Sequence, residues 1–489
     1  MITVIGLDGS PLTPRASAAI AGASLVLGGR RQLAAMAPAL AVAGAPAADL
    51  PATGQPATRQ TDGGQTDGGQ TDGGAARLIP LGPLRPALDV LAAHEGDAVV
   101  LASGDPGFFG IVRALRERGL AAVVLPAVSS VSLAFARAGL AWDDALVVSA
   151  HGREMRCAVN VCRAHPKVAV LTGPGQGPAE IGAALAGWPR RLLVAECLGG
   201  PDERITECSP AAAAERGWAG PNVVLVLADP SPAAASPSPA AEVTTGPDMT
   251  AEAGVTARAA PGWCWAGEAS SERGVRPGGS GPSGWALPEE AFEHRDSMIT
   301  KAEVRALALA RLAPRHGVLV WDVGAGSGSV AVECARLGAA VIAVDRDQGQ
   351  CARVAANARR HGVEVRVVGG QAPAALDPLP DPDAVFVGGG GLDVVAAVAA
   401  RQPGRIVVAL AAVDRAGPVL AALGGAGYAV EGTLLQAARL APLPDGTHRL
   451  AAVNPVLLLW GSRQPPPGPV ARPPEDASPT EDTSPPEGR

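Results

Sequence analysis

A glycine-rich turn in the second half of the chain limits the possible folds more than any other feature. The apolar stretch Val320–Val323 runs into Gly324-Ala325-Gly326-Ser327-Gly328, and a helix-forming pattern follows over 330–337. Glycines at such a turn let backbone amides approach a ligand closely, and a helix N-terminus favours a carboxylate or phosphate. The next apolar stretch ends in Asp345, about 20 residues after the first glycine, where an acidic side chain can accept hydrogen bonds from ribose hydroxyls. The pattern predicts a site for an adenosine-type ligand.

The spacing of the glycines bears on which ligand this is. Dinucleotide enzymes carry GxGxxG, with a third glycine at the position that Ser329 occupies here. This chain has GxGxG with Asp322 just before it, a form that looks like class I methyltransferases. In that case an amino-acid carboxylate lies over the turn. A dehydrogenase and a plain tight turn between strand and helix stay open as alternatives at this point.

The segments around the turn alternate between strand and helix patterns. Strands are predicted over 318–323, 339–345, 364–368, 384–387 and 405–409, and helices over 301–312, 330–337 and 348–361. This alternation predicts a doubly wound, Rossmann-like α/β sheet with crossover helices.

The first half of the chain also reads as α/β. Strands are predicted over 2–5, 99–102, 121–125, 146–149, 168–171, 192–195 and 223–227, with helices over 110–118, 130–138 and 178–186 between some of them. The alternation predicts parallel architecture. Two loops, 103–110 and 126–131, follow strands directly, and open α/β sheets bind ligands at the carboxyl ends of their strands. A plain turn is an equally good interpretation of each loop.

Three stretches have the composition of unpacked chain. Residues 52–76 contain three tandem copies of a Thr-Asp-Gly-Gly repeat, 229–285 are rich in Ser, Pro, Ala and Gly, and 462–489 are rich in Pro and acidic residues. We interpret them as a low-complexity insertion, a disordered interdomain linker and a disordered tail. Two modules remain, 1–228 and 286–461, as expected because single cores stop growing near ~250–300 residues.

Charge and cysteine content exclude several classes. The formal charge is -7 and aromatic residues are 3% of the chain, so neither a basic stripe nor base-stacking platforms for nucleic acid are expected. The seven cysteines show no close CxxC spacing, so we expect reduced thiols and no metal site. The start lacks a signal-peptide pattern and no apolar run reaches the ~20 residues of a membrane span, which predicts a cytoplasmic protein without membrane contacts.

Several segments resemble a known family, the tetrapyrrole methylases of the corrin pathway, in the fused form that joins such a module to a class I methyltransferase. The first half contributes ITVIGLDG with LTP, SGDPGFFG and PAVSSV. The second half contributes MITKAEVR at 298–305, WDVGAGSGSVAVE, GGQAP at 369–373, DAVFVGGGG at 383–391 and Asn454-Pro455. The resemblance covers nearly the whole chain outside the three low-complexity stretches.

The resemblance implies an enzyme with two S-adenosylmethionine (SAM) sites. It implies methylation of a precorrin at carbon 5 by the first module, and methylation at carbon 15 with decarboxylation of the ring C acetate by the second, in cobalamin biosynthesis. It also implies self-association. The implied cofactor contacts of the first module are Gly6, Asp8, Gly9, Ser103, Gly104, Asp105, Ser129, Ser130 and Thr172. Those of the second are Thr300, Gly324, Ala325, Gly326, Ser327, Gly328, Asp345, Ala372, Gly388, Gly389 and Gly390.

A precorrin carries many carboxylates, so its pocket should supply fixed cations, with Arg preferred for bidentate pairing. The candidates are Lys301, Arg305, Arg439, His448 and Arg449 in the second module, and His151 and Arg153 in the first. Each has a solvated surface cation as its simpler interpretation.

No catalytic residue is identified, because methyl transfer mainly requires alignment of donor and acceptor in a dry pocket. Two further functions stay open: a SAM-dependent methyltransferase that acts on nucleic acid or on another small molecule, and a scaffold without turnover. A nucleic-acid methyltransferase is disfavoured by the acidic charge and by the lack of a (D/N)PP(Y/F/W) segment that would hold a flipped base. A cofactor-binding scaffold without turnover is not excluded by the sequence.

Overall fold

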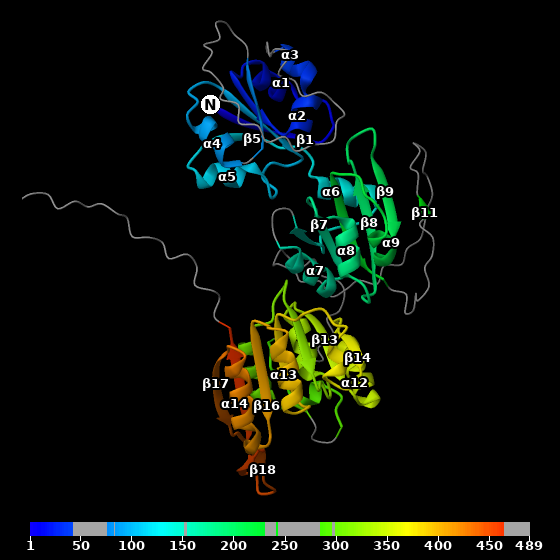
Figure 1. The fold of residues 1–489 in the computed structure, drawn as a ribbon, viewed down its shortest axis with the longest axis vertical. Coiled ribbons are helices and arrows are strands. Elements are labelled where there is room, and N and C mark those ends of the chain that lie inside the picture. Colours follow the sequence, from blue (N-terminus) through cyan, green and yellow to red (C-terminus); the bar gives the residue numbers. More distant parts are fainter. Residues whose placement is uncertain are drawn as a thin grey trace, which may run out of the picture. The chain divides into compact units, whose positions relative to one another are not determined.

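The computed structural model describes residues 1–42, 76–82, 84–150, 154–229, 241–242, 284–295 and 299–463. The chain divides into two compact units, Met1–Ser271 and Glu272–Arg489, called unit 1 and unit 2 below (Figure 1). The predicted insertion, linker and tail lie almost entirely outside the described residues, as do His151 and Arg153. The predicted boundaries of these stretches stay predictions. One difference is visible: Ala241 and Glu242, inside the predicted linker, pair with a strand of unit 1.

The first sheet of unit 1 is entirely parallel, as predicted, with strand order β3-β2-β4-β1-β5. Its strands are β1 (Ile2–Leu7), β2 (Leu25–Gly28), β3 (Arg77–Pro80), β4 (Ala98–Ser103) and β5 (Ala122–Leu125). Its helices are α1 (Pro14–Ala21), α2 (Arg30–Ala35), α3 (Ala37–Val42), α4 (Leu84–Ala92) and α5 (Ile111–Glu117). The central strands read as continuous apolar runs because both of their faces are covered, and Val4, Ile5 and Val100 are at most 1% exposed.

The second sheet of unit 1 is mixed, with order β11-β9-β8-β10-β7-β6. Its strands are β6 (Leu146–Ser149), β7 (Lys167–Leu171), β8 (Arg190–Glu196), β9 (Arg204–Cys208), β10 (Asn222–Ala228) and β11 (Ala241–Glu242), and its helices α6 (Ser130–Arg137), α7 (Met155–Ala164), α8 (Pro178–Ala184) and α9 (Pro210–Ala214). Only β6 and β7 pair in parallel. The expectation of parallel architecture is wrong for this sheet. The short loop between β8 and β9 returns the chain directly, whereas a parallel pair needs a long crossover.

Unit 2 contains the doubly wound sheet predicted from the sequence, extended by two further strands that are joined through antiparallel pairs. The sheet order is β14-β13-β12-β15-β16-β20-β17, and the first five strands are parallel. The strands are β12 (Leu319–Val323), β13 (Ala340–Asp345), β14 (Arg366–Gly369), β15 (Ala384–Val387), β16 (Arg405–Leu410), β17 (Ala429–Leu435) and β20 (Val456–Ser462). The helices are α10 (Ala302–Leu312), α11 (Ser329–Arg336), α12 (Gln348–Arg360), α13 (Leu392–Ala400) and α14 (Ala416–Gly425), with short 3-10 turns η2 (Glu289–Ala291), η3 (Ala374–Leu376) and η4 (Val413–Arg415).

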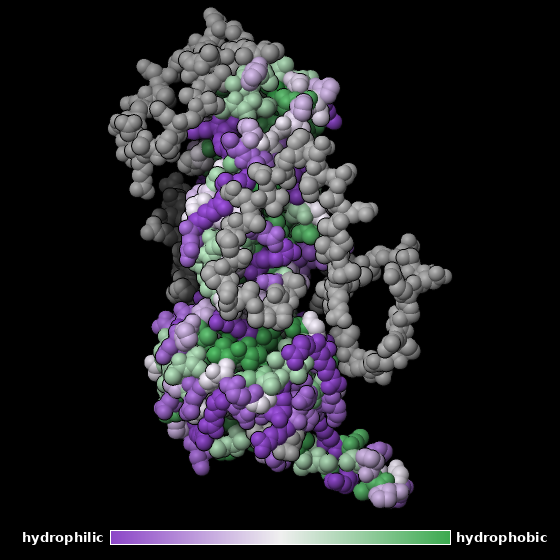
Figure 2. Space-filling view, turned by 90° about the vertical axis from the view of Figure 1, so that its right-hand side faces the viewer, coloured by the Kyte–Doolittle hydropathy of each residue, from purple (hydrophilic) through white to green (hydrophobic). Residues whose placement is uncertain are grey.

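A two-stranded hairpin, β18 (Ala438–Pro442) with β19 (His448–Ala452), follows β17. Because β16 and β17 both run antiparallel to β20, β17 ends at the same edge as the parallel strands. We call this the carboxyl edge of unit 2. Figure 2 shows the hairpin projecting from unit 2 with apolar side chains on its surface, and Leu440 and Leu450, which pair across it, are 72% and 68% exposed.

No helix in the described part of the chain combines the length and apolar character needed to cross a bilayer.

Candidate functional site

The glycine-rich turn lies at the carboxyl edge of unit 2, between β12 and α11. Gly324 and Gly326 adopt φ values of +74° and +55°, a region that side-chain-bearing residues rarely enter. A Cβ atom on Gly324 would lie 2.9 Å from the amide nitrogen of Gly389, so the Gly388-Gly389-Gly390 turn packs directly against it. A Cβ on Gly326 would meet no protein atom within 4 Å. The turn is therefore closed on one side and open on the other.

Asp345, at the end of β13, is hydrogen-bonded to the turn. Its Oδ2 atom accepts from the Gly326 amide at 2.8 Å, and its Oδ1 atom accepts from the Asp347 amide at 2.9 Å. A carboxylate offers about four lone-pair sites, so these two bonds leave acceptor capacity beside the open face of Gly326. The structure thus brings the turn and Asp345 into direct contact, and their common role in binding a ligand stays a prediction.

Asp322 is a fully buried acid directly before the turn, and it was not among the site residues predicted from the sequence. Its Oδ2 atom accepts from the Ala331 amide at 2.9 Å in the first turn of α11, whereas Oδ1 has no hydrogen-bond partner. Burial raises the pKa of Asp322 to about 7, and the nearby charge of Asp345 also raises it. Its position just before the first glycine was the signal that could have identified it.

The start of α10 and the loop after β14 complete this edge. The Thr300 carbonyl accepts from Arg305 at 2.6 Å, and Lys301 is the N-cap residue of α10. The Gly370 amide donates to the Asp345 backbone carbonyl at 2.9 Å, which holds the loop that contains Ala372 against the end of β13. Segments distant in sequence therefore lie at the same edge of the sheet as the turn.

Arg305 is not available to a substrate, which corrects the sequence-based expectation. Its side chain is 0% exposed and its Nε atom donates to the equally buried Glu333 at 2.6 Å. It also donates to the carbonyls of Thr300 and Leu287. A buried cation must be paired to be tolerated, and Arg305 satisfies that need entirely within the protein.

Arg439 is likewise committed to internal partners. Its guanidinium makes four hydrogen bonds of 2.6–2.8 Å to the carboxylates of Glu289 and Glu303. These bonds join β18 to η2 and to the start of α10, and hydrogen bonding to Arg439 lowers the pKa of Glu289 to about 2. Two acids already compensate its charge, so the expectation that Arg439 binds substrate carboxylates is corrected.

His448 and Arg449 do not lie on the same face of the hairpin. They are neighbours in β19, and successive side chains of a strand point to opposite faces. At most one of them can therefore face a given ligand. Lys301 remains the predicted substrate cation that lies at the carboxyl edge and has no side-chain partner within the described residues.

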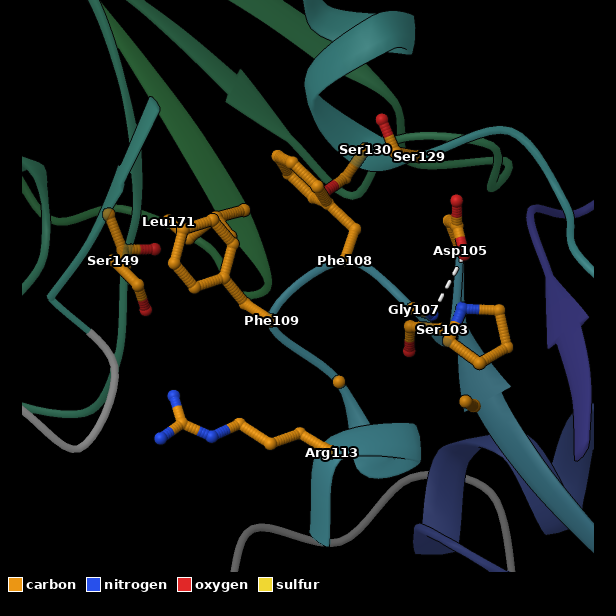
Figure 3. Close-up of a pocket in the computed structure, with 14 residues that line it drawn as sticks. Ser103, Asp105, Gly107, Phe108, Phe109, Arg113, Ser129, Ser130, Ser149 and Leu171 are labelled. Atoms are coloured by element: carbon orange, nitrogen blue, oxygen red, sulfur yellow. Dashed lines mark hydrogen bonds between the residues drawn. The ribbon is translucent and has the colours of Figure 1, made fainter. Parts of the chain in front are cut away.

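Unit 1 contains a cavity of about 720 Å³ at the carboxyl ends of β4, β6 and β7 (Figure 3). Five predicted cofactor residues line it: Ser103, Asp105, Ser129, Ser130 and Thr172. Asp105 accepts from the Gly107 amide at 2.8 Å, and Ser129 caps α6. The Thr172 hydroxyl donates to the Asn222 carbonyl at 2.6 Å. The two loops singled out in the sequence therefore meet at one cavity.

The other predicted residues of unit 1 are not among those that line the cavity. A Cβ on Gly6 would lie 2.2 Å from the Gly104 carbonyl, and one on Gly9 would lie 1.9 Å from that of Gly199. Asp8 accepts from the Ser10 and Val128 amides at 3.0 and 3.1 Å. Slight burial raises its pKa, but these hydrogen bonds outweigh that effect and lower it overall. These residues hold neighbouring loops together.

Phe109 and Arg113 also line the cavity, and sequence reasoning missed both. Phe109 has a φ of +53°, unusual for a bulky residue, and is 50% exposed. Figure 3 shows the Arg113 guanidinium beside the cavity on the side of Phe109. Arg113 is paired with Glu117 one helical turn away, at 2.8 Å, and its side chain is 76% exposed. Its place soon after the SGDPGFFG segment was the available signal.

Comparisons with known proteins agree with both units. Residues 4–214 match the tetrapyrrole (corrin/porphyrin) methylases, and residues 290–456 match the precorrin methyltransferase domain. A precorrin-6Y C(5,15)-methyltransferase (decarboxylating) from Sinorhizobium is 36% identical over 67% of this chain and 72% of its own length. The protein of the same name from Mycobacterium tuberculosis is 34% identical over 69% and 73%.

The chain belongs to the precorrin-6Y C(5,15)-methyltransferase (decarboxylating) family. A probable cobalt-precorrin-6B C(15)-methyltransferase from Pyrobaculum calidifontis, 39% identical, covers 35% of this chain with 93% of its length. As a member of the precorrin-6Y C(5,15)-methyltransferases, the chain is an enzyme, and the family resemblance inferred from sequence is confirmed. The dehydrogenase, the plain turn, the nucleic-acid methyltransferase and the scaffold are set aside. Membership in a methyltransferase family also implies the use of SAM.

Proposed function

We propose that the chain methylates a precorrin at carbons 5 and 15 and removes the carboxyl group of its ring C acetate, with SAM bound at two separate sites. One observation carries the proposal: the hydrogen bond from Gly326 to Asp345 beside the open face of the glycine turn, in a member of this family. The bond joins the backbone amides of the turn to an acid placed for ribose recognition.

In unit 2, Asp345 would accept hydrogen bonds from the ribose hydroxyls of SAM. The first amides of a helix lack partners within it. In α11 the Ala331 amide is taken by Asp322, which leaves those of Ser329 and Val330 to donate to the amino-acid carboxylate of SAM. The predicted contacts at Thr300, Ala372 and Gly388–Gly390 belong to segments at the same edge of the sheet as the turn. These assignments are our proposal.

In unit 1, the cavity lined by Ser103, Asp105, Ser129, Ser130 and Thr172 would hold the second SAM molecule. Small side chains and exposed backbone at the ends of strands let a polar ligand approach the main chain closely. Gly6, Asp8, Gly9 and Gly104 would keep the surrounding loops in place, and only indirectly affect binding.

When bound, SAM supplies an electrophilic methyl group on its sulfonium sulfur. The task of the chain is to hold donor and acceptor in line and to exclude water. The meso carbons of a reduced tetrapyrrole are enamine-like nucleophiles because of the ring nitrogens, so no strong protein base is required. The conjugated macrocycle can take up the electron pair left by decarboxylation, so the hard chemistry belongs to the substrate.

The substrate is a polyanion, and the available cations indicate how it is held. We propose Lys301 at the carboxyl edge of unit 2 and Arg113 at the cavity of unit 1, since Arg305 and Arg439 are occupied by internal acids. Self-association and a cytoplasmic location stay predictions. The exposed Leu440 and Leu450 pair would be a natural contact for a second copy.

The direct test is turnover. The full chain, given SAM and the reduced precorrin substrate, should yield a product that has gained two methyl groups and lost one carbon dioxide, as measured by mass spectrometry. The Asp345→Ala variant should stop at the singly methylated species that retains the carboxyl group. Unchanged substrate with the intact chain would contradict the proposal.

A further inference from the structure

The segment before α10 is fastened to unit 2 by side chains from three helices. We call its described part, residues 284–295, the strap. Glu333 accepts from the amides of Ala286 and Leu287, and Arg305 donates to the Leu287 carbonyl. His361 is hydrogen-bonded to the Ala291 carbonyl at 2.9 Å. Phe292, 2% exposed, packs against the Arg305 guanidinium and the His361 ring. The strap is therefore an integral part of unit 2.

Asn357 on α12 joins this strap to the glycine turn. Its side chain is 0% exposed. Its Oδ1 atom accepts from the Glu293 amide at 2.7 Å, and its Nδ2 atom donates to the Glu293 carbonyl at 2.9 Å and to the Ser327 carbonyl at 2.8 Å. An amide group has two N–H donors, so both are used. One side chain therefore connects two backbone segments that are distant in the sequence. Its contacts in them, Glu293 and Ser327, are 34 residues apart.

The Ser327 carbonyl, which accepts from Asn357, belongs to a peptide group of the turn whose carbonyl and amide are both hydrogen-bonded. The next amide, on Gly328, donates to the Ala325 carbonyl at 2.8 Å, so the Ser327–Gly328 peptide is fixed at both ends. Gly326 and Gly328, on either side of Ser327, have φ values of +55° and +72°. The orientation of this peptide sets the direction of the amides that begin α11. Losing the bond from Asn357 would leave a buried carbonyl unsatisfied and free the turn to reorient.

We propose that Asn357 is a positioning residue for the cofactor site of unit 2: by tying Ser327 to the strap, it keeps the glycine turn in its ligand-ready shape. The proposal rests on the proposed function in that the turn is taken to hold SAM. When only a fraction of the protein molecules has the conformation that binds a ligand, the apparent affinity for that ligand is reduced by that fraction. Loosening the turn should therefore weaken SAM binding in unit 2 without touching any ligand atom.

The test compares Asn357→Asp and Asn357→Ser with His361→Leu in the full chain. The Asp variant replaces the donor group by a carboxylate oxygen, and the Ser variant removes the amide without adding charge. His361→Leu loosens the strap alone, since His361 bonds to Ala291 and not to the turn. Hydrogen–deuterium exchange of peptides spanning 324–332 measures the turn with no cofactor added, and calorimetric titration measures SAM binding.

We expect exchange in the turn to rise at least tenfold in both Asn357 variants and to stay unchanged in His361→Leu. SAM affinity at one of two sites should fall about tenfold or more in the Asn357 variants only, even where the thermal midpoints of all variants match. Equal exchange of the turn in the Asn357 variants and the intact chain would overturn the inference. If exchange is faster in the Asn357 variants but the intact chain binds no SAM in unit 2, the role of Asn357 in holding the turn would stand and the proposed function would be refuted.

Discussion

The carboxylate of Asp345 accepts a hydrogen bond from the Gly326 amide at 2.8 Å, which links the end of one parallel strand to the turn that follows its neighbour. If this pair marks a SAM site, the intact chain should bind two equivalents of SAM and Asp345→Ala should bind one. Hydrogen bonds to a charged group contribute about 1.5–3 kcal/mol, so loss of two should weaken the site by more than a hundredfold. Calorimetric titration measures both stoichiometry and affinity.

Asp347→Ala is the matched control for that substitution. Asp347 accepts from the Gly349 and Gln350 amides and caps α12, and loss of such a cap costs about 1 kcal/mol of stability. The control should lower the unfolding midpoint and still bind two equivalents. A single equivalent in the intact chain, unaffected by Asp345→Ala, would refute the two-site proposal.

Asp322 gives unit 2 a specific pH dependence. Its pKa is raised from 3.8 to about 7 by burial, so the folded state holds a proton that the unfolded state releases. The free energy of unfolding should therefore fall as the pH rises from about 4 to 7, because the folded state binds more protons over that range. Asp322→Asn stays neutral and should flatten this slope.

Urea unfolding of both forms at several pH values between 4 and 8 measures the slope. The difference between the intact chain and Asp322→Asn should lie within this window. The acids with lowered pKa affect stability in a different pH range. Glu289, with a pKa of about 2, contributes stability that is lost only as the pH falls below about 4.5. Parallel curves for the two forms between pH 4 and 7 would mean that Asp322 is ionised in the folded state.

Local sequence patterns predicted the parts of the site that are local in the fold. The strand, turn and helix around Gly324–Gly328 lie within one continuous segment, and Asp345 ends the next strand. Strand direction in the second sheet of unit 1 was not predictable, because an apolar run such as β8 looks the same whichever way its neighbours run. The composition of a strand does not distinguish parallel from antiparallel pairing.

The roles of the arginines depended on contacts that the sequence does not reveal. Arg305 pairs with Glu333, 28 residues away, and Arg439 pairs with Glu289, 150 residues away. Both acids lie on elements whose packing is set by the whole sheet. An arginine in a segment that resembles the family can therefore be interpreted equally well as a substrate contact or as part of an internal ion pair, until its surroundings are known.

Removal of the charge should affect substrate binding at Lys301 and protein stability at Arg439. Lys301→Met should raise the KM for the precorrin in the carbon 15 step by about three- to tenfold, as expected for ~1 kcal/mol from a partly exposed ion pair, with the thermal midpoint unchanged. Arg439→Met breaks four hydrogen bonds between β18, η2 and α10. It should lower the midpoint and increase exchange in the hairpin.

Steady-state kinetics of methylation at carbon 15 and thermal unfolding, measured on both variants, separate the two roles. The comparison is informative because both cations lie near the start of α10. A raised KM in Arg439→Met at an unchanged midpoint would restore Arg439 as a substrate contact, and an unaffected KM in Lys301→Met would remove Lys301.

Arg113 should be the substrate cation of unit 1. Its guanidinium lies beside the cavity (Figure 3), where it and Asp105 are the charged side chains among the lining residues. A precorrin carboxylate could compete with Glu117, which holds Arg113 by an exposed i,i+4 pair of about 0.3–0.5 kcal/mol. Arg113→Ala should raise the KM for the precorrin in the carbon 5 step about three- to tenfold and leave the KM for SAM unchanged.

Arg116→Ala is the control, since Arg116 lies on the same helix, α5, but does not line the cavity. It removes the same charge from the same unit, so a long-range electrostatic effect on a polyanionic substrate would appear equally in both variants. The contact at Arg113 should make its effect several times larger, and high salt should reduce the effects of both variants, because exposed ion pairs are screened. Equal effects of the two substitutions would mean that the charge of unit 1 attracts the precorrin without a direct contact at Arg113.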